Sequence, residues 1–154
     1  HEQEKNQPLV LTTLLDTTLN QIRHMSHFER LDIQYNLQCK GVLSVPKSHI
    51  TLIVENLISN AVKYQDLEKK SSFIRISTYN VNDAFILEVA DNGLGIPPDQ
   101  HANLFKMFKR FHPKTAFGSG LGLYMVKKSA DKLGGQLQFE SVDEETRFSL
   151  ILPS

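Results

Sequence analysis

The sequence predicts an α+β fold, a two-layer α/β sandwich in which helices cover one face of a mixed, mostly antiparallel sheet. Three segments, near residues 15, 57 and 127, place apolar residues at the spacing of a helix that buries one side. Other segments alternate apolar and polar residues as half-buried strands do, and two of them flank a short turn. Helical and alternating segments follow one another without internal repeats, so one interleaved domain is expected.

The first half of the chain predicts a helix, a strand and a second helix. Apolar residues recur at helical spacing from Leu11 to Ile22, and residues 31–39 then alternate as a strand does. Ser48 is expected to cap the N-terminus of the second helix, because its hydroxyl can accept a hydrogen bond from a backbone N–H. That helix is predicted to run to about Gln65, where the polar run 66–72 ends it.

The second half predicts a hairpin, a long loop, a final helix and two closing strands. Glycine and proline are frequent in the loop, which is predicted to contain only a short helix, and long loops of this kind are usually functional. The predicted bounds are 73–79 and 84–90 for the hairpin strands, 92–117 for the loop with its short helix at 101–108, 121–133 for the final helix, and 136–141 and 147–152 for the closing strands.

Composition and charge limit the function classes. The 154 residues are 40% hydrophobic, which is enough for one self-sufficient core. The 17 basic and 17 acidic side chains cancel, so no overall field attracts nucleic acid or an anionic membrane, and neither is expected as a partner. No apolar run approaches the roughly 20 residues that span a bilayer. The lone cysteine, Cys39, excludes an internal disulfide and is expected to be buried.

Four polar residues share one stripe of the second predicted helix. At about 100° per residue, Asn56, Asn60, Lys63 and Tyr64 fall along the flank of the apolar face. Amide oxygens are good ligands for a hard cation, and a lysine can balance the charge of a phosphate group. The stripe therefore indicates a polar cleft between helix and sheet. The competing interpretation is a solvated helix surface, which is the expected one for a lone asparagine.

Two glycine-containing segments add possible ligand contacts. The run Asp91–Gly95 follows an apolar strand, so a carboxylate stands at a strand end beside backbone that a ligand can approach closely. The run Gly118–Gly122 opens the last helix, where free backbone N–H groups and the helix dipole favour phosphate. Taken singly, the first is also an ordinary turn and the second a weak signal. The second is not a P-loop, because no Gly-Lys-Ser or Gly-Lys-Thr follows.

In this order and at these spacings, the three segments resemble the N, G1 and G2 boxes of the ATP-binding domain of sensor histidine kinases, within the GHKL ATPase superfamily. Residues 55–64 are similar to the N box, 91–97 to the G1 box and 118–126 to the G2 box. Residues 105–112 resemble the F box in the form common among PAS-linked and phytochrome-like kinases. The resemblance extends over about residues 45–154 and implies a histidine kinase-like ATPase fold.

The resemblance implies a site for Mg-ATP. It assigns Asn60 as the Mg²⁺ ligand, Asp91 as the partner of the adenine amino group and Tyr64 as a wall of the base pocket. The residues that it implies to face the phosphates, and to be catalytic, are Asn56, Lys63 and Arg110. The other implied nucleotide-binding residues are Gly93, Gly95, Ile96, Phe105, Gly118, Gly120, Leu121, Gly122, Leu123 and Thr146. The loop at 92–117 is implied to be an ATP lid.

The implied activity is that of a protein histidine kinase in two-component signal transduction. The domain donates the γ-phosphate of ATP to a histidine on a separate dimerisation domain, of the same or the sister protomer, so the parent is a phosphoprotein. A response regulator is an indirect partner. The implied cofactors are ATP and Mg²⁺. The domain is expected in the cytoplasm without direct membrane contact, in a parent protein that can itself be membrane-anchored.

The resemblance also divides the chain. Residues 1–25 are expected to be a linker helix that follows a dimerisation and phospho-acceptor hairpin missing from this sequence, and residues 26–154 the ATP-binding catalytic domain. The acceptor of such kinases is a histidine followed by Glu or Asp and soon by Pro. His27 gives only a faint likeness because no proline follows it. The fragment is therefore not expected to autophosphorylate alone.

Two departures from the family pattern keep other functions open. ATP-hydrolysing relatives place a general-base glutamate four residues before the metal-binding asparagine, and that position here is Asn56. Glu145 stands where a glycine usually precedes the residue that matches Thr146. The alternatives are a non-catalytic, nucleotide-dependent interaction module and a GHKL-type ATPase, and Asn56 argues against the second because it is a poor general base.

Overall fold

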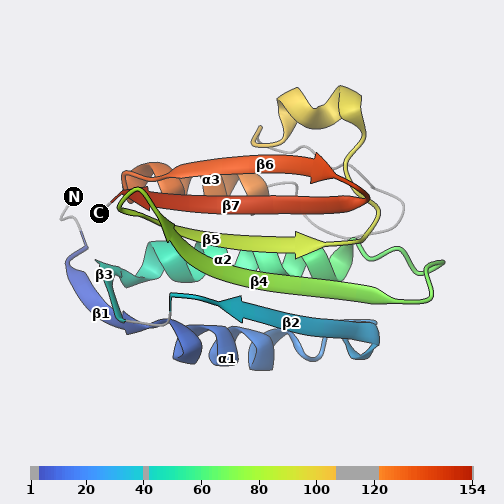
Figure 1. Cartoon of the computed structure of the whole chain (residues 1–154), viewed down its shortest axis with the longest axis horizontal. Helices are drawn as coiled ribbons and strands as arrows, with labels where there is room; N and C mark the ends of the chain where they lie inside the picture. Colours follow the sequence, from blue (N-terminus) through green and yellow to red (C-terminus); the bar gives the residue numbers. More distant parts are fainter. Residues whose placement is uncertain (1–3, 40–41, 107–121, 154) are drawn as a thin grey trace.

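A computed structural model of the chain describes residues 4–39, 42–106 and 122–153 (Figure 1). Its elements, in chain order, are β1 (Asn6–Val10), α1 (Leu11–Ile22), η1 (Phe28–Arg30), β2 (Leu31–Leu37), β3 (Val42–Pro46), α2 (Lys47–Lys63), β4 (Ser72–Val81), β5 (Ala84–Asp91), η2 (Pro98–Asn103), α3 (Gly122–Lys132), β6 (Gln136–Val142) and β7 (Glu145–Pro153). The elements labelled η are short 3₁₀ helices.

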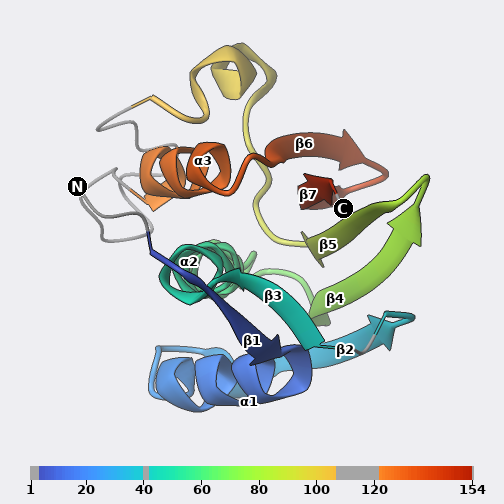
Figure 2. The same cartoon turned by 90° about the vertical axis from the view of Figure 1, so that its left-hand side faces the viewer.

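Five strands form the main sheet in the order β2-β4-β5-β7-β6. β2 and β4 are parallel, and every other neighbouring pair in this sheet is antiparallel. The helices α1, α2 and α3 lie on one face of the sheet, as Figure 2 shows. β1 and β3 form a separate two-stranded antiparallel ribbon. The predicted α+β fold with a mixed, mostly antiparallel sheet is therefore confirmed.

Alternation along the strands and periodicity along the helices build the two layers. In β4, Ile74 and Ile76 are fully buried on the helix side, while Arg75 between them lies on the opposite face. α2 contributes an apolar stripe of seven buried residues to the same core. α1 belongs to this core as well, through residues such as Leu11 and Leu15. Each element has one apolar side, and stacking them buries all of these sides together.

The second helix begins differently from the sequence prediction. β3 runs to Pro46 and passes directly into α2, so Ser48 lies inside the first turn and the prediction that it is the N-cap is wrong. The capping group comes instead from Glu4, whose carboxylate accepts the Ser48 N–H at 3.1 Å and also binds the Ser48 hydroxyl. These bonds, the one to the hydroxyl above all, hold the pKa of Glu4 below its ordinary value. A carboxylate at this end of a helix also suits the helix dipole.

Most other predicted elements agree with the structure to within about two residues, as expected for boundaries judged from patterns. The ribbon of β1 and β3 is missed, because both strands are five residues long and contain a proline. The short helix expected at 101–108 is a 3₁₀ helix at Pro98–Asn103, which begins earlier because Pro98 starts it. Residues 107 and 108 lie outside the described part. Cys39 is partly rather than fully buried.

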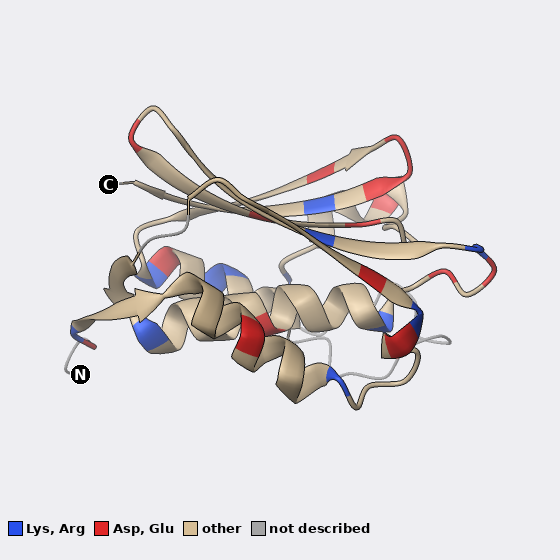
Figure 3. Cartoon of the chain, turned by 60° about the horizontal axis from the view of Figure 1, so that its bottom comes forward, with Lys and Arg blue, Asp and Glu red and all other residues tan. Residues whose placement is uncertain are grey.

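Charged residues of both signs are spread over the molecule. Figure 3 shows basic and acidic residues interspersed over the sheet, the helices and the turns. Within the described ranges, none of the helices is both long enough and apolar enough to cross a bilayer.

Candidate functional site

A pocket of about 40 Å³ lies between α2 and the sheet. Its lining comes from α2, the ends of β5 and β7, the turn after β5, and α3. Seven lining residues are ones that the sequence predicts for the site: Asn60, Tyr64, Asp91, Gly95, Ile96, Leu123 and Thr146. The structure therefore brings together predicted residues that are far apart in the sequence.

A larger hollow of about 470 Å³ adjoins this pocket, and Gly95, Ile96 and Thr146 line both. The pocket alone is far smaller than the roughly 300 Å³ or more that small-molecule sites usually offer.

Asp91 is the last residue of β5, and strands on both sides fix its position. It pairs with Ile74 of β4 and Thr146 of β7, and its side chain and that of Thr146 both line the pocket. Burial raises the pKa of the Asp91 carboxyl to about 6, although the Gly93 N–H, which donates to Oδ1 at 2.8 Å, and the charge of Lys69 both lower it. A carboxylate with so little competing water is a strong hydrogen-bond acceptor.

A close backbone contact requires glycine at position 93. A Cβ atom there would lie 2.3 Å from the carbonyl oxygen of Tyr64 and 2.9 Å from Asp91 Oδ1, both inside van der Waals contact. The next residue, Leu94, donates its N–H to the same Tyr64 oxygen at 2.8 Å. These contacts fasten the turn after β5 to the end of α2. Gly95 has a φ of +74°, in the left-handed region that favours glycine.

Gly122 is the first residue of α3, and it lies close to the side-chain amides of Asn56 and Asn60 on α2. A Cβ atom at this position would lie 3.2 Å from Asn56 Oδ1 and 3.9 Å from the amide atoms of Asn60. Asn56 Nδ2 donates to the Leu52 carbonyl at 2.9 Å, which fixes the orientation of the amide. The start of α3, where backbone N–H groups lack partners within the helix, therefore adjoins both amides, and such an arrangement can bind an anion.

Some predicted residues lie away from the pocket. Lys63 is exposed and lines a different hollow of about 820 Å³ together with His24 and Leu67, so the structure does not bring it to Asn60 and Asp91. Phe105 meets the pocket indirectly, because its ring stands edge-on to Phe148 with 6.5 Å between centroids. The predictions for Arg110, Gly118, Gly120 and Leu121 lie outside the described residues.

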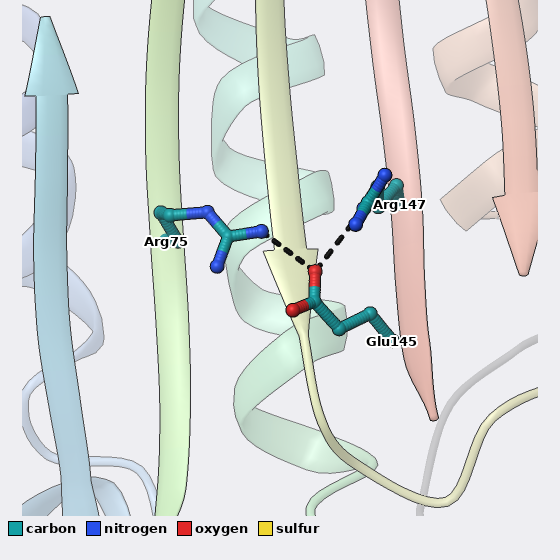
Figure 4. Close-up of polar contacts among 3 residues, drawn as sticks. All are labelled: Arg75, Glu145 and Arg147. Carbon is teal, nitrogen blue, oxygen red and sulfur yellow. Dashed lines mark hydrogen bonds and ion pairs between the residues drawn. The ribbon is translucent and has the colours of Figure 1, made fainter. Parts of the chain in front are cut away.

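Glu145, the departure from the family pattern, is held on the sheet face opposite the helices. Its Oε1 accepts hydrogen bonds from Arg75 at 2.6 Å and from Arg147 at 3.1 Å (Figure 4). Burial opposes ionisation of Glu145, but the two arginines outweigh it and hold its pKa below the ordinary value. Thr146 points the other way and is buried in the pocket wall. A glutamate at 145 is therefore compatible with the site.

The predicted metal site depends on Asn60. In the part of the chain that the structure describes, no three His, Cys, Asp or Glu side chains lie close enough together to hold a metal ion. Mg²⁺ usually keeps several waters and is held by a few protein oxygens together with substrate phosphates. One amide oxygen fits an ion that arrives with a phosphate ligand, and it does not make an independent metal site.

Sequence reasoning missed two kinds of residue. The first is the apolar lining of the pocket, which carries only the periodicity of ordinary core residues: Leu57, Ala61, Val89 and Phe148. The second is Lys69, whose Nζ donates to the Asn92 carbonyl oxygen at 2.6 Å. Nothing in the polar run 66–72 distinguishes this lysine from its exposed neighbour Lys70.

Comparison with known proteins supplies related sequences. The family described as "Histidine kinase-, DNA gyrase B-, and HSP90-like ATPase" matches residues 46–154. The circadian input-output histidine kinase CikA of Synechococcus elongatus is 30% identical over 154 residues, with 95% of this chain and 20% of CikA covered. Cyanobacterial phytochrome B of a Nostoc species is 31% identical over 140 residues, with 84% of this chain and 18% of that protein covered. The chain thus spans about a fifth of the length of these relatives.

Solved structures are also similar. The mycobacterial sensor histidine kinase MprB gives a TM-score of 0.80 at 25% identity, with 96% of this chain and 97% of that chain covered. ShkA, solved full-length in complex with AMPPNP, gives 0.80 at 20% identity, with 99% of this chain and 32% of ShkA covered. The catalytic domain of the histidine kinase ThkA gives 0.81 at 18% identity, with 97% and 95% covered. The last two likenesses concern the fold alone.

Proposed function

The chain belongs to the family of histidine kinase-, DNA gyrase B- and HSP90-like ATPases, and we propose that it is the Mg-ATP-binding catalytic domain of a two-component sensor histidine kinase. In this role it donates the γ-phosphate of ATP to a histidine on a separate dimerisation domain, of the same or the sister protomer. A response regulator receives the phosphoryl group from that histidine.

The observation that carries the proposal is the convergence of an amide, a carboxylate and a helix start in one place. Asn60 and Asp91 line the same pocket, and Gly122 at the start of α3 adjoins the amide of Asn60. These three residues come from separate segments, yet they supply groups suited to a metal ion, an amino group and a phosphate, respectively. Mg-ATP contains all three of these groups in one ligand.

At the base end of the site, Asp91 accepts a hydrogen bond from the exocyclic amino group of adenine. Its carboxylate is suited to this because it is largely shielded from water and oriented by the Gly93 N–H. Tyr64, Ile96 and Leu123 form the walls against the ring. The nearby residues Gly93, Gly95 and Thr146 set how closely the base approaches the backbone and the sheet.

At the phosphate end, the start of α3 provides hydrogen-bond donors, and Asn60 provides the protein oxygen for the metal ion. Asn56 lies beside the start of α3, with its Oδ1 nearest to Gly122 and its Nδ2 bound to the Leu52 carbonyl. A bound Mg²⁺ neutralises phosphate charge during transfer. The domain itself supplies position and charge rather than a covalent intermediate. Lys63, Phe105, Arg110, Gly118, Gly120 and Leu121 remain part of this proposal on the strength of the motifs.

We further propose that residues 1–25 are the linker from the dimerisation domain and residues 26–154 the catalytic domain. α1 packs into the same core as α2 and the sheet, which supports a linker that is firmly joined to the catalytic domain. Glu4 strengthens that junction, because it binds Ser48 at the start of α2.

Asn56 makes the ATPase alternative less suitable. Its Nδ2 is engaged with the Leu52 carbonyl at 2.9 Å, and an amide cannot take a proton from water at neutral pH. Slow intrinsic hydrolysis is therefore expected. An interaction module that only binds nucleotide differs from the kinase in one respect, namely that no phosphoryl group is transferred.

Calorimetry with ATP, with and without Mg²⁺, tests the binding part of the proposal, and GTP is the control for the base. Phosphoryl transfer is then measured by adding a histidine-bearing dimerisation hairpin as a separate chain with radiolabelled ATP. Label on the hairpin supports the kinase. ATP binding without label supports the interaction module, and rapid phosphate release by the domain alone supports the ATPase. Absence of ATP binding would contradict all three.

A further inference from the structure

The turn after Asp91 is tied to the loop between α2 and β4 through Asn92. The Oδ1 atom of Asn92 accepts the Phe73 N–H at 2.9 Å, and its Nδ2 donates to the Ser71 carbonyl at 2.9 Å. Its backbone carbonyl oxygen accepts the third bond, from Lys69 Nζ at 2.6 Å. Of these three bonds, the last uses a side chain of the loop, so it depends on which residue stands at position 69.

Lys69 is itself held in place by the loop. Its backbone N–H donates to the Asp66 carbonyl at 3.1 Å, and the Glu68 N–H donates to Asp66 Oδ1 at 3.1 Å. A turn closed by an aspartate in this way has a defined shape. The lysine side chain is partly buried, in contrast to that of its exposed neighbour Lys70. Its ammonium group therefore starts from a fixed backbone position.

One peptide unit connects Lys69 to Asp91. The carbonyl oxygen of Asn92 accepts from Lys69, and the N–H of the same peptide, which belongs to Gly93, donates to Asp91 Oδ1 at 2.8 Å. The peptide is planar, so fixing the direction of its carbonyl also fixes the direction of its N–H. A cation on the oxygen also polarises the unit and strengthens the N–H as a donor.

We propose that Lys69 is a positioning residue for nucleotide recognition: through the Asn92–Gly93 peptide, its ammonium group orients the Asp91 carboxylate toward the amino group of the base. The inference rests on the proposed function, because it needs Asp91 to bind adenine. Lys69 lines the neighbouring hollow of about 470 Å³ and not the pocket beside α2 that Asp91 lines, so its effect on Asp91 passes through the turn.

The charges around Asp91 support the same role. Lys69 lowers the pKa of Asp91 and Glu145 raises it, while burial remains the larger influence. The other charged or titratable groups on the neighbouring hollow and on Glu145 are Asp66, His101, Glu144, Arg75 and Arg147. Without the Lys69 ammonium, the carboxylate loses a nearby positive charge and takes up a proton at higher pH.

The test compares Lys69→Met with Lys70→Met, which removes the same charge from the exposed neighbour. We expect Lys69→Met to weaken ATP binding about tenfold at neutral pH, the scale of one hydrogen bond from a charged group. The loss should grow as the pH falls from about 8 to about 6, whereas a general loss of structure would weaken binding equally at both. Lys69→Arg should restore most of the affinity, and Lys70→Met should bind as the wild type does.

A second measurement does not depend on nucleotide. In the ligand-free chain, Lys69→Met should speed hydrogen exchange at the Gly93 N–H relative to Lys70→Met, because the peptide is no longer held. Should Lys69→Met fail to fold, Lys69→Gln replaces it under the same criteria. If the Lys69 variants bind ATP as the wild type does and their Gly93 N–H exchanges at the wild-type rate, the inference is overturned. The proposed function is then left intact. A wild type that binds no ATP, together with faster exchange in Lys69→Met, instead overturns the proposed function and with it the role in base recognition.

Discussion

The backbone N–H of Leu94 donates to the carbonyl oxygen of Tyr64 at 2.8 Å, and this hydrogen bond joins the end of α2 to the turn that follows β5. Tyr64 also ends α2 by donating its own N–H to the Asn60 carbonyl at 3.0 Å. The position of the turn beside Asp91 is therefore set by α2, the helix that carries Asn56 and Asn60. A change at this junction is expected to disturb both ends of the site together.

Replacing Gly93 by alanine tests this junction directly. The added Cβ would lie 2.3 Å from the Tyr64 carbonyl oxygen, a backbone atom that cannot turn aside. Forcing an atom into such a space typically costs about 1–3 kcal/mol, and we expect the upper half of that range together with loss of ATP binding. Chemical denaturation and calorimetry measure the two effects.

The matched control is Gly134→Ala, at the end of α3. This glycine has a φ of +70° but no atom within 4 Å of a built Cβ, so the added methyl meets strain and not a collision. We expect a loss of about 1 kcal/mol in the free energy of unfolding with unchanged ATP affinity. Equal ATP affinity in Gly93→Ala and Gly134→Ala would contradict the role of the junction.

Asp91→Asn is expected to abolish adenine-specific binding and, at the same time, to stabilise the nucleotide-free domain at neutral pH. The pKa of Asp91 is raised from an ordinary value of 3.8 to about 6, so the folded state holds this proton more tightly than the unfolded state does. Stability contributed by the proton is present at low pH and is lost as the pH rises from about 4 to about 6. An amide at position 91 has no charge to bury and avoids this loss.

Thermal unfolding of the two proteins between about pH 4 and pH 8 measures the effect. The curves should coincide at the acid end, and Asp91→Asn should melt higher above the pKa. Asp16→Asn on the exposed side of α1 removes the same charge and should show no such difference. A pH-independent gain, or unchanged ATP affinity in Asp91→Asn, would count against the buried carboxylate as the base-binding group.

Sequence patterns predict the site residues through the combination of segments. A lone asparagine on a helix flank and an Asp-Asn-Gly turn are both ordinary, and the predictions for Asn60 and Asp91 depend on the order and spacing of the three segments and on their resemblance to the family boxes. Thr146 was placed by family likeness, and it lies beside Asp91 because β5 and β7 pair in that register. The helix projection was less successful for Lys63, which is the last residue of α2 and faces another hollow.

The contacts that the sequence could not indicate join side chains to distant backbone. Lys69 binds a carbonyl 23 residues away, and Glu4 binds a backbone N–H 44 residues away. Backbone atoms are the same at every position, so no residue pattern records such partners. The fold class could be predicted because alternation and helical periodicity reflect burial, whereas these contacts depend on how loops approach one another.

Glu145→Gln tests whether the arginine pair on the outer sheet face needs its carboxylate. Arg75 and Arg147 both bind Oε1, and a neutral amide would leave two positive charges facing each other. We expect a loss of roughly 0.5–1 kcal/mol in the free energy of unfolding, because these side chains are partly solvated, and a smaller loss at high salt. Glu144→Gln, next in sequence and exposed, should change little. A loss that is the same at all salt concentrations would argue against an electrostatic origin.

Asn60→Ala separates the metal-dependent part of ATP binding from the rest. The substitution removes one amide oxygen on α2 and keeps a good helix former, so the fold is expected to persist. If Asn60 is the protein ligand of Mg²⁺, the variant loses most of the affinity gained on adding Mg²⁺, roughly tenfold for one such interaction, while Mg²⁺-free binding stays the same.

Asn56→Ala provides the contrast, since its amide is proposed to face the phosphates directly and its loss should weaken binding with and without the ion. Calorimetric titrations with ATP over a series of Mg²⁺ concentrations distinguish the two variants. An unchanged response to Mg²⁺ in Asn60→Ala would remove this residue from the metal site.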